Sequence, residues 1–200
     1  MRIRSARTGD TPELYEIALA TGNVGGDARA LHRHPNLMGE VYVGPYLAQA
    51  PHLAFVIADD DDRPRGYVLG TPDTRRFETW TEAHWWPDVR RRTEAIDDAT
   101  PSDEALLELI RAPRRAPDDL VASYPAHGHI DLLPEAQGQG LGRALLERLM
   151  QELASSGVTG LHLEMDPRNS GAQHFYARLG FAVVDGPPGS VVMARRLTPQ

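Results

Sequence analysis

Apolar and polar residues follow two spacings along this chain, alternation in some segments and a helical period in others. The opening residues MRIRSA alternate, and HLAFVIAD and GYVLGTP read as two strands joined across a polar turn. HIDLLP (129–134) and LHLEMD (161–166) are two further extended runs. Between these two runs, leucines recur at helical spacing: Leu141, Leu145, Leu149 and Leu153. This alternation of strands and helices is typical of an α/β fold.

A glycine-rich run, Gln137-Gly138-Gln139-Gly140-Leu141-Gly142, stands between the HIDLLP strand and the leucine helix. A glycine turn that opens a helix presents several free backbone N–H groups at one point, and the positive end of the helix dipole lies behind them. Glycine is needed there because a Cβ would hold a ligand away from the backbone. The run therefore predicts a binding site for a phosphate group.

The glycine spacing narrows the choice of phosphate ligand. The dinucleotide fingerprint G-x-G-x-x-G is not matched, since after Gly138, Gly140 and Gly142 the next position of that pattern is Leu145. No acidic residue is obviously placed to hold a ribose hydroxyl either. A P-loop needs a lysine, and the chain contains none. A dinucleotide-binding protein stays only as a third hypothesis.

A second motif, PRNSGAQHFYARLGFAVV, follows the LHLEMD strand. Asn169 can cap a helix that carries Tyr176, and Gly180 is well placed to end it. We assign Phe175 and Phe181 to core packing. The patterns Q-x-x-G-x-G and N-x-x-A-x-x-F-Y-x-x-x-G-F, in this order and one strand apart, are similar to the coenzyme A elements of the GNAT N-acetyltransferases. This resemblance implies acetyl-CoA as co-substrate.

The resemblance extends over nearly the whole chain. The succession of GEVYVGPYL, HLAFVIAD, GYVLG, a tryptophan-rich insert and the glycine loop resembles the acetyltransferase-like domain at the C-terminus of O-GlcNAcase and its stand-alone bacterial relatives. The human domain of this group is regarded as a pseudo-acetyltransferase that has lost its coenzyme site. The loop glycines are intact in this chain, so we expect coenzyme binding to be retained.

The fold implied by the resemblance is the GNAT acyl-CoA N-acyltransferase fold. It has a central mixed sheet of about six or seven strands that is split after the fourth strand, with helices on both faces. We expect residues 1–200 to form a single domain, with 74–126 as a helical insertion between the third and fourth strands on the presumed acceptor side. Trp85 and Trp86 either shape an acceptor pocket or pin this insert to the body. The segment 36–50 is expected to be a lid or a substrate-side loop that carries Tyr42 and Tyr46.

The resemblance also implies roles for individual residues. Leu132 and Leu133 would supply backbone groups to the pantetheine arm, and one of them would polarise the thioester carbonyl. Asn169 would hydrogen-bond the arm, and Tyr176 matches the family tyrosine that often protonates the departing sulfur. The pyrophosphate would be held by the loop residues Gln137, Gly138, Gln139, Gly140, Leu141, Gly142 and Arg143.

Two sets of residues compete for the role of general base. His127, His129 and Asp131 share one face of their strand, and His129 and Asp131 are well placed if that face borders the acceptor cavity. Glu164 and Asp166 on the next strand form the second set. His127, His129 and Asp131 could also be metal ligands, but no further metal pattern accompanies them, and we expect no metal.

Composition limits the class of protein. The net charge of −7 argues against nucleic acid as a partner and mildly favours a cationic small-molecule or peptide amine as acceptor. The absence of cysteine excludes disulfides and a cysteine acyl-enzyme. No apolar run is long enough for a membrane span, and the N-terminus lacks a signal core, so a cytoplasmic location is expected. A homodimer through the last strands is common in such folds.

The sequence therefore predicts an acyltransferase that moves acetyl from acetyl-CoA to an amine of unknown identity, by direct attack in a ternary complex. The alternative is an acetyl-CoA-binding or protein-interaction module without turnover.

Overall fold

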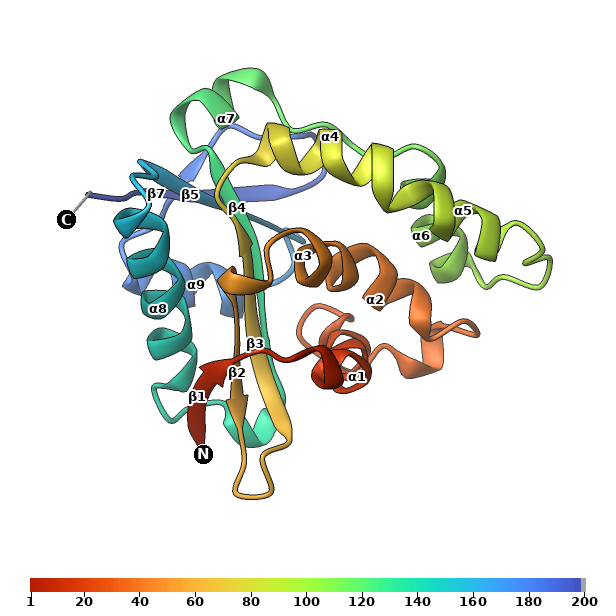
Figure 1. The fold of residues 1–200 in the computed structure, drawn as a ribbon, viewed down its shortest axis with the longest axis horizontal. Helices are drawn as coiled ribbons and strands as arrows, with labels where there is room; N and C mark the ends of the chain where they lie inside the picture. Colours follow the sequence, from red (N-terminus) through yellow and green to blue (C-terminus); the bar gives the residue numbers. More distant parts are fainter. Residues whose placement is uncertain (199–200) are drawn as a thin grey trace.

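One sheet with seven strands organises the chain. Figure 1 shows the fold in the computed structural model, which describes residues 1–198. The strand order is β1-β2-β3-β4-β5-β7-β6. Only β4 and β5 are parallel, and every other neighbouring pair in the described sheet is antiparallel. The strands are β1 (Arg2–Ser5), β2 (Ala54–Ala58), β3 (Pro64–Thr71), β4 (Ala126–Leu132), β5 (Gly160–Met165), β6 (Ala182–Val184) and β7 (Val191–Arg196).

Helices lie on both faces of this sheet, which confirms the predicted fold class. In Figure 1, α8 lies on one side of β1–β3, and α1, α2 and α3 lie on the other. The helices are α1 (Thr11–Thr21), α2 (Asn36–Tyr42), α3 (Gly44–Gln49), α4 (Thr74–His84), α5 (Trp86–Thr93), α6 (Pro101–Arg111), α7 (Asp118–Ser123), α8 (Leu141–Ser155) and α9 (Ser170–Arg178).

The sheet splits between β4 and β5, as predicted. Their ladder contains only the pairs Ala126↔Leu161 and His127↔His162. From Gly128 onward β4 pairs with β3 alone within the described residues, so the backbone groups on its other edge are left for a ligand. The split thus lies beside the glycine loop, which follows β4 after a single 3₁₀ turn (Pro134–Ala136).

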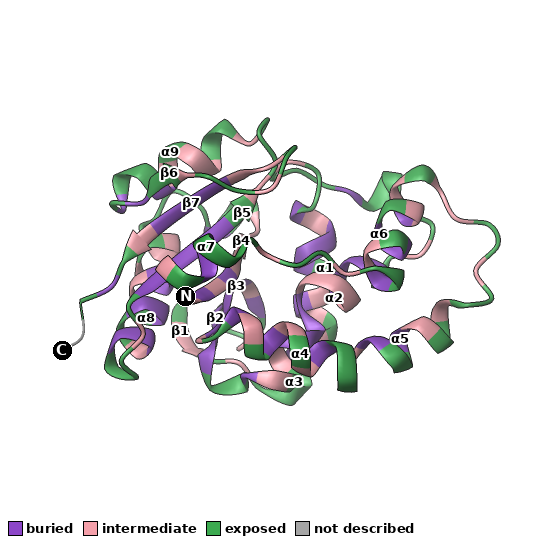
Figure 2. Cartoon of the chain, turned by 90° about the horizontal axis from the view of Figure 1, so that it is seen from above, coloured by how far each residue is buried: buried purple, intermediate pink, exposed green. Residues whose placement is uncertain are grey.

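The leucines whose spacing predicts α8 are the residues that pack this helix against the sheet. Leu145, Leu149 and Leu153 are fully buried against β2, β3 and the strands beyond the split. Gly70 of β3 permits the close approach, because a Cβ there would lie 2.7 Å from a methyl group of Leu149. Figure 2 shows the resulting pattern, with buried positions along the strands and exposed positions on the outer sides of the helices.

The segment 36–50 is not the loop that the sequence predicts. It forms α2 and α3, which pack on the sheet as part of the core that includes Tyr46, 3% exposed. Gly44 lets the two helices pass close to the insert, since a Cβ there would lie 2.4 Å from the Trp85 ring. Burial on several sides erases the helical periodicity, so the apolar and aromatic residues of this segment gave no readable helix pattern.

The predicted helical insert is present as α4, α5, α6 and α7. Trp86 is buried, with 6% of its surface exposed, and the indole N–H of Trp85 donates to the carbonyl oxygen of Glu40 at 3.0 Å. Both tryptophans therefore pin the insert to α2 and α3. Trp80 and His84 border a separate surface hollow of about 320 Å³.

A fully buried carboxylate, Asp103, holds the start of α6 to the chain before α2. It accepts hydrogen bonds from the amide of Thr100 and the amide of Arg33, each at 3.0 Å, and from the Thr100 hydroxyl at 2.9 Å. The Nδ1 atom of His32 lies 2.9 Å from its other oxygen. Although burial alone would raise the pKa of this carboxyl, these hydrogen bonds lower it to about 2.

We expect Asp103→Asn to lower the free energy of unfolding by about 2 kcal/mol at pH 7, because the amide cannot accept the same set of bonds. The folded-state pKa lies below the ordinary value, so the Asp103 contribution is complete above pH 4 and is lost as the pH falls through 2. Urea unfolding at pH 7 and pH 3 measures it, with the exposed Asp97→Asn as control. A difference in the free energy of unfolding between wild type and Asp103→Asn that is as large at pH 3 as at pH 7 would contradict this role of Asp103.

Candidate active site

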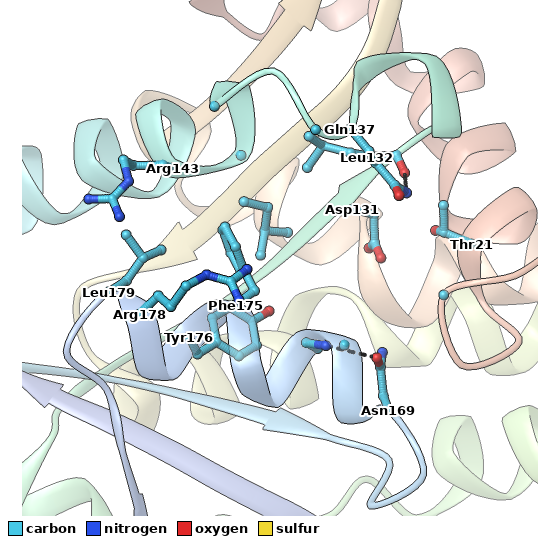
Figure 3. A pocket seen from close by; sticks show the side chains of 17 residues that line it. Thr21, Asp131, Leu132, Gln137, Arg143, Asn169, Phe175, Tyr176, Arg178 and Leu179 are labelled. Atoms are coloured by element: carbon cyan, nitrogen blue, oxygen red, sulfur yellow. Dashed lines mark hydrogen bonds between the residues drawn. The ribbon is translucent and has the colours of Figure 1, made fainter.

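A cavity of about 490 Å³ opens where β4 and β5 separate (Figure 3). Three parts of the chain line most of it: the end of β4, the glycine loop with the start of α8, and α9. Thr21, the last residue of α1, and Gly25 in the following turn close one end. The lining residues are Thr21, Gly25, Ile130, Asp131, Leu132, Gln137, Gly138, Gly140, Gly142, Arg143, Asn169, Gly171, Ala172, Phe175, Tyr176, Arg178 and Leu179.

The glycine loop presents free amides to this cavity. Gly138 and Gly140 have φ angles of +73° and +76°, and an ideal Cβ on either would meet nothing within 4 Å. None of the amide N–H groups from Gly138 to Arg143 has a hydrogen-bond partner among the described residues, and no side chain caps α8. The loop is therefore an open anion cradle at a helix N-terminus.

Two glutamine side chains brace this loop. The Nε2 atom of Gln137 donates to the carbonyl oxygen of Leu132 at 2.8 Å. The Nε2 atom of Gln139 donates to the carbonyl oxygen of Glu135 at 2.7 Å, and Gln139 does not line the cavity. Leu141 also lies outside the lining, since its side chain packs against the core on the α8 face.

Leu132 and Leu133 differ in their access to the split. The amide N–H of Leu133 donates to the carbonyl oxygen of Arg65 at 2.9 Å, so it points toward β3. Peptide groups alternate along a strand, and those of Ile130 and Leu132 therefore point toward the split. The Leu133 side chain packs against the core on the α1–α3 face and is absent from the cavity lining.

Two predicted residues of α9 reach the cavity. The Oδ1 atom of Asn169 accepts a hydrogen bond from the amide of Ala172 at 3.0 Å and caps the helix, as predicted. Burial, and then the nearby charge of Asp131, raise the pKa of the Tyr176 phenol, which therefore keeps its proton. The Tyr176 hydroxyl forms no hydrogen bond within residues 1–198. Every fully buried side-chain polar atom of these residues has a partner, so the Tyr176 oxygen is not fully buried and is open to the cavity that Tyr176 lines.

Asp131 lines the cavity on the same side as Thr21 (Figure 3). One of its oxygens, Oδ2, accepts a hydrogen bond from the phenol of Tyr67 at 2.6 Å. Burial raises the pKa of the Asp131 carboxyl above its ordinary value, although the hydrogen bond from Tyr67 opposes the rise. A carboxyl with a raised pKa is a better proton acceptor than an ordinary one.

The histidines that share a strand face with Asp131 are enclosed. The ring of His129 lies edge-on to Tyr42 and Tyr46, with centroids 5.3 Å and 5.2 Å away, and it does not line the cavity. Burial lowers the pKa of His129 to about 4. The Nδ1 atom of His127 lies 2.8 Å from the hydroxyl of Thr74, and its ring stacks on His162.

The second set of candidate bases stays outside the cavity. Glu164 is exposed and lies 4.0 Å from Arg114 of the insert. Asp166 holds Arg168 in an exposed ion pair at 2.7 Å, and hydrogen bonding from this arginine lowers the pKa of Asp166 to about 2. Within residues 1–198, no group of three or more histidine or acidic side chains is arranged to hold a metal ion.

Several cavity residues were missed by reasoning from the sequence. Thr21 ends the distant helix α1 and Gly25 lies in the turn after it, and Arg178 is a variable position of the α9 motif, two residues after Tyr176. Tyr67 reaches Asp131 because the two residues are direct partners in the β3–β4 register. A hairpin register across an insert leaves no signal in the sequence, whereas the α9 spacing could have indicated Arg178.

The fold and cavity can now be compared with known proteins. The sequence model of the Acetyltransferase (GNAT) family matches residues 114–181. The crystal structure of SsHAT shares 36% sequence identity with this chain at a TM-score of 0.89, and the match covers 98% of both chains. The structure of yncA, a putative acetyltransferase from Salmonella typhimurium with its cofactor acetyl-CoA, has a TM-score of 0.56 at 18% identity over 100% of this chain and 95% of that one.

Two curated relatives match in sequence. Protein O-GlcNAcase from Rattus norvegicus is 24% identical over 168 residues, which is 81% of this chain and 18% of the relative. The [ribosomal protein bS18]-alanine N-acetyltransferase of Escherichia coli (strain K12) is 41% identical over 71 residues, 30% of this chain and 48% of the relative. The chain thus spans less than a fifth of the first relative and about half of the second.

A split mixed sheet with an anion cradle beside the split defines an acyltransferase fold. The chain belongs to the acetyltransferase (GNAT) family, which confirms the predicted family and its class of enzyme. The predicted likeness to O-GlcNAcase is confirmed as well. No helix of residues 1–198 has both the length and the apolar character needed to cross a membrane.

We expect the His129 ring to stay neutral throughout the physiological pH range and to titrate with a midpoint near pH 4, because its charged form would be buried. The folded-state pKa is depressed, so His129 lowers the free energy of unfolding as the pH falls from 6.5 to 4. NMR titration of the histidine rings measures this midpoint, and His129→Gln assigns the resonance. A titration midpoint above pH 6 would contradict the burial of the His129 ring between its neighbours.

Proposed function

We propose that this protein transfers an acetyl group from acetyl-CoA to an amine by direct attack in a ternary complex. The observation that carries the proposal is the row of unpartnered amides from Gly138 to Arg143, facing the unpaired edge of β4. The free amides are suited to bind a phosphate group. The unpaired edge of β4 is suited to pair with an extended, amide-bearing chain. The acetyl-CoA bound by yncA supports this choice of ligand.

The residues of the cavity supply the binding groups. The amides of the glycine loop would hold the pyrophosphate, with Gln137, Gln139 and Leu141 shaping the loop and Arg143 beside it. The peptide groups of Ile130 and Leu132 would pair with the pantetheine arm, and the Leu132 amide would polarise the thioester carbonyl. Asn169 would bond the arm through its free amide nitrogen, since its oxygen already caps α9.

Two side chains would move protons. Asp131 would take a proton from the acceptor ammonium, which leaves a neutral amine to attack the thioester carbonyl carbon. A C–N bond forms, the C–S bond breaks, and the Tyr176 phenol would protonate the departing sulfur. The His129 ring packs edge-on against Tyr42 and Tyr46 and does not line the cavity, so we assign the base to Asp131. The chain has no cysteine for an acyl-enzyme on sulfur.

The acceptor is an amine of a small molecule or peptide in this proposal. The bS18 relative is named for N-acetylation of an alanine of a ribosomal protein, which supports an amine acceptor in general terms. The predicted homodimer stays a prediction.

We expect Gly140→Ala to weaken acetyl-CoA binding by at least about tenfold, because its Cβ would enter the space in front of the free amides. Gly157→Ala is the matched control, since Gly157 also has a positive φ, of +79°, with nothing within 4 Å of its Cβ, but lies outside the cavity lining. Both variants should lose about 1 kcal/mol of stability from left-handed strain.

Thermal unfolding with and without acetyl-CoA measures this difference, with NADH as the control ligand. A ligand at 100 times its Kd adds about 2.7 kcal/mol to the free energy of unfolding, which raises the unfolding midpoint by about 5–10 °C for a chain of this size. Wild type and Gly157→Ala should show the full rise, and Gly140→Ala a smaller one. Equal rises in all three proteins would contradict the loop as the pyrophosphate site, and a larger rise with NADH would favour a dinucleotide.

We expect Tyr176→Phe to lower the rate of acetylation by about 10²-fold or more while acetyl-CoA binding is retained, because the proton donor to sulfur is lost. Tyr124→Phe, on a tyrosine outside the cavity lining, is the control and should keep the wild-type rate. Acetyl-CoA binding by wild type without acetylation of any amine in a broad panel would favour the alternative, a binding module without turnover.

A further inference from the structure

A second hollow, of about 320 Å³, lies on the insert, where α4 and α5 meet α3. It shares no lining residue with the cavity at the split. No residue of this hollow takes part in the proposed acetyl transfer. Its volume lies at the small end of the range for ligand pockets, which fits a ligand with one ring and a short side chain.

Aromatic side chains form the apolar wall of the hollow. Trp80 and His84 lie one turn apart on α4, and their ring centroids are 5.5 Å apart. Trp80 is half-buried and belongs to neither hydrophobic core, whereas Trp85 packs against the core on the α1–α3 face. Trp85 also borders the hollow, and its indole N–H is already bound to the carbonyl oxygen of Glu40. The exposed part of the Trp80 ring is therefore free to stack with a flat ligand.

The polar groups around this wall are mostly hydrogen-bond donors. The indole N–H of Trp80 forms no hydrogen bond within residues 1–198, in which every fully buried polar side-chain atom has a partner, so this N–H is accessible. Arg91 donates to Asp88 at 2.7 Å and Arg92 donates to Glu40 at 3.1 Å, each through one nitrogen atom. Because a guanidinium carries several N–H donors, both arginines keep free ones.

The charges of the hollow favour an anion. Among the described residues that line it, Asp88 is the one acidic side chain, and it faces two arginines, although the whole chain has a net charge of −7. The Arg91 and Asp88 side chains are 71% and 64% exposed, and an ion pair this exposed contributes little to stability. A ligand carboxylate can therefore bind the Arg91 guanidinium beside Asp88 or in its place.

We propose that this hollow binds a small aromatic carboxylate, with the ring against Trp80 and the carboxylate on Arg91. The two groups of such a ligand match the two features of the hollow, an exposed indole and a nearby guanidinium with free donors. An aromatic amine would bring a positive charge toward Arg91 and Arg92. An aliphatic carboxylate would leave the indole without a stacking partner.

NMR titration of the nitrogen-15-labelled protein with sodium 3-phenylpropionate tests this site. The chain has three tryptophans, and Trp86, which is buried and does not line the hollow, is the internal control. The indole N–H resonance of Trp80 should shift and saturate with a Kd of about 5 mM or lower, while that of Trp86 stays in place. Butyrate, which has no ring, and 3-phenylpropan-1-amine, which has the opposite charge, should give no saturable shift of the Trp80 resonance.

Two surface substitutions should change this affinity in opposite directions. Arg91→Gln should weaken 3-phenylpropionate binding by about three- to tenfold, and Asp88→Asn should strengthen it by about two- to threefold, because Arg91 then lacks its competing carboxylate. Arg111→Gln, on an exposed arginine that pairs with Glu104 outside the hollow, is the matched control and should keep the wild-type Kd.

Three results would overturn the proposal. The first is the absence of a saturable Trp80 shift up to about 20 mM 3-phenylpropionate, a concentration at which even a weak ligand of this size would bind. The second is an equal shift with 3-phenylpropan-1-amine, since the site would then not select an anion. The third is an unchanged Kd in Arg91→Gln, which would leave the carboxylate without its proposed partner.

Discussion

The parting of β4 from β5 is the constraint on which the rest of this molecule depends. A parallel pair that stopped pairing in a sheet core would normally leave backbone groups without partners, at a substantial cost in free energy. Here the glycine loop lies one 3₁₀ turn beyond the end of β4, and α9 borders the other side of the gap. The peptide groups of Ile130 and the amide N–H of Leu132 point toward this open edge, while the Leu132 carbonyl already accepts a hydrogen bond from Gln137. Such an edge is suited to pair with an extended ligand.

Burial then separates the titratable groups that the strand pattern places together. His127, His129 and Asp131 alternate along one face of β4, but only Asp131 stands at the open end of the split. The histidines lie under α2, α3 and α4, where aromatic rings surround them and hold them neutral. The same sheet face thus carries two packed histidines and, at its end, a carboxyl that borders the cavity.

The insert contributes to this separation without lining the main cavity. Thr74 and Phe77 of α4 contact His127, and Trp85 and Trp86 hold α4 and α5 against α2 and α3. The insert therefore enlarges the core on the α1–α3 face and closes the histidine side of the split. The acceptor approaches, in our proposal, from the end bordered by Thr21 and Asn169.

The sequence by itself determined the parts whose signals are local: the glycine loop, the amphipathic α8, and the Asn169 cap with Gly180 at the other end of α9. Their spacing and capping chemistry act within one or two turns, so they are legible without tertiary contacts. Only the tertiary structure decided that 36–50 is helical, that His129 is enclosed, and that Tyr67 holds Asp131. These outcomes depend on register and burial between segments far apart in the chain, which no local pattern encodes.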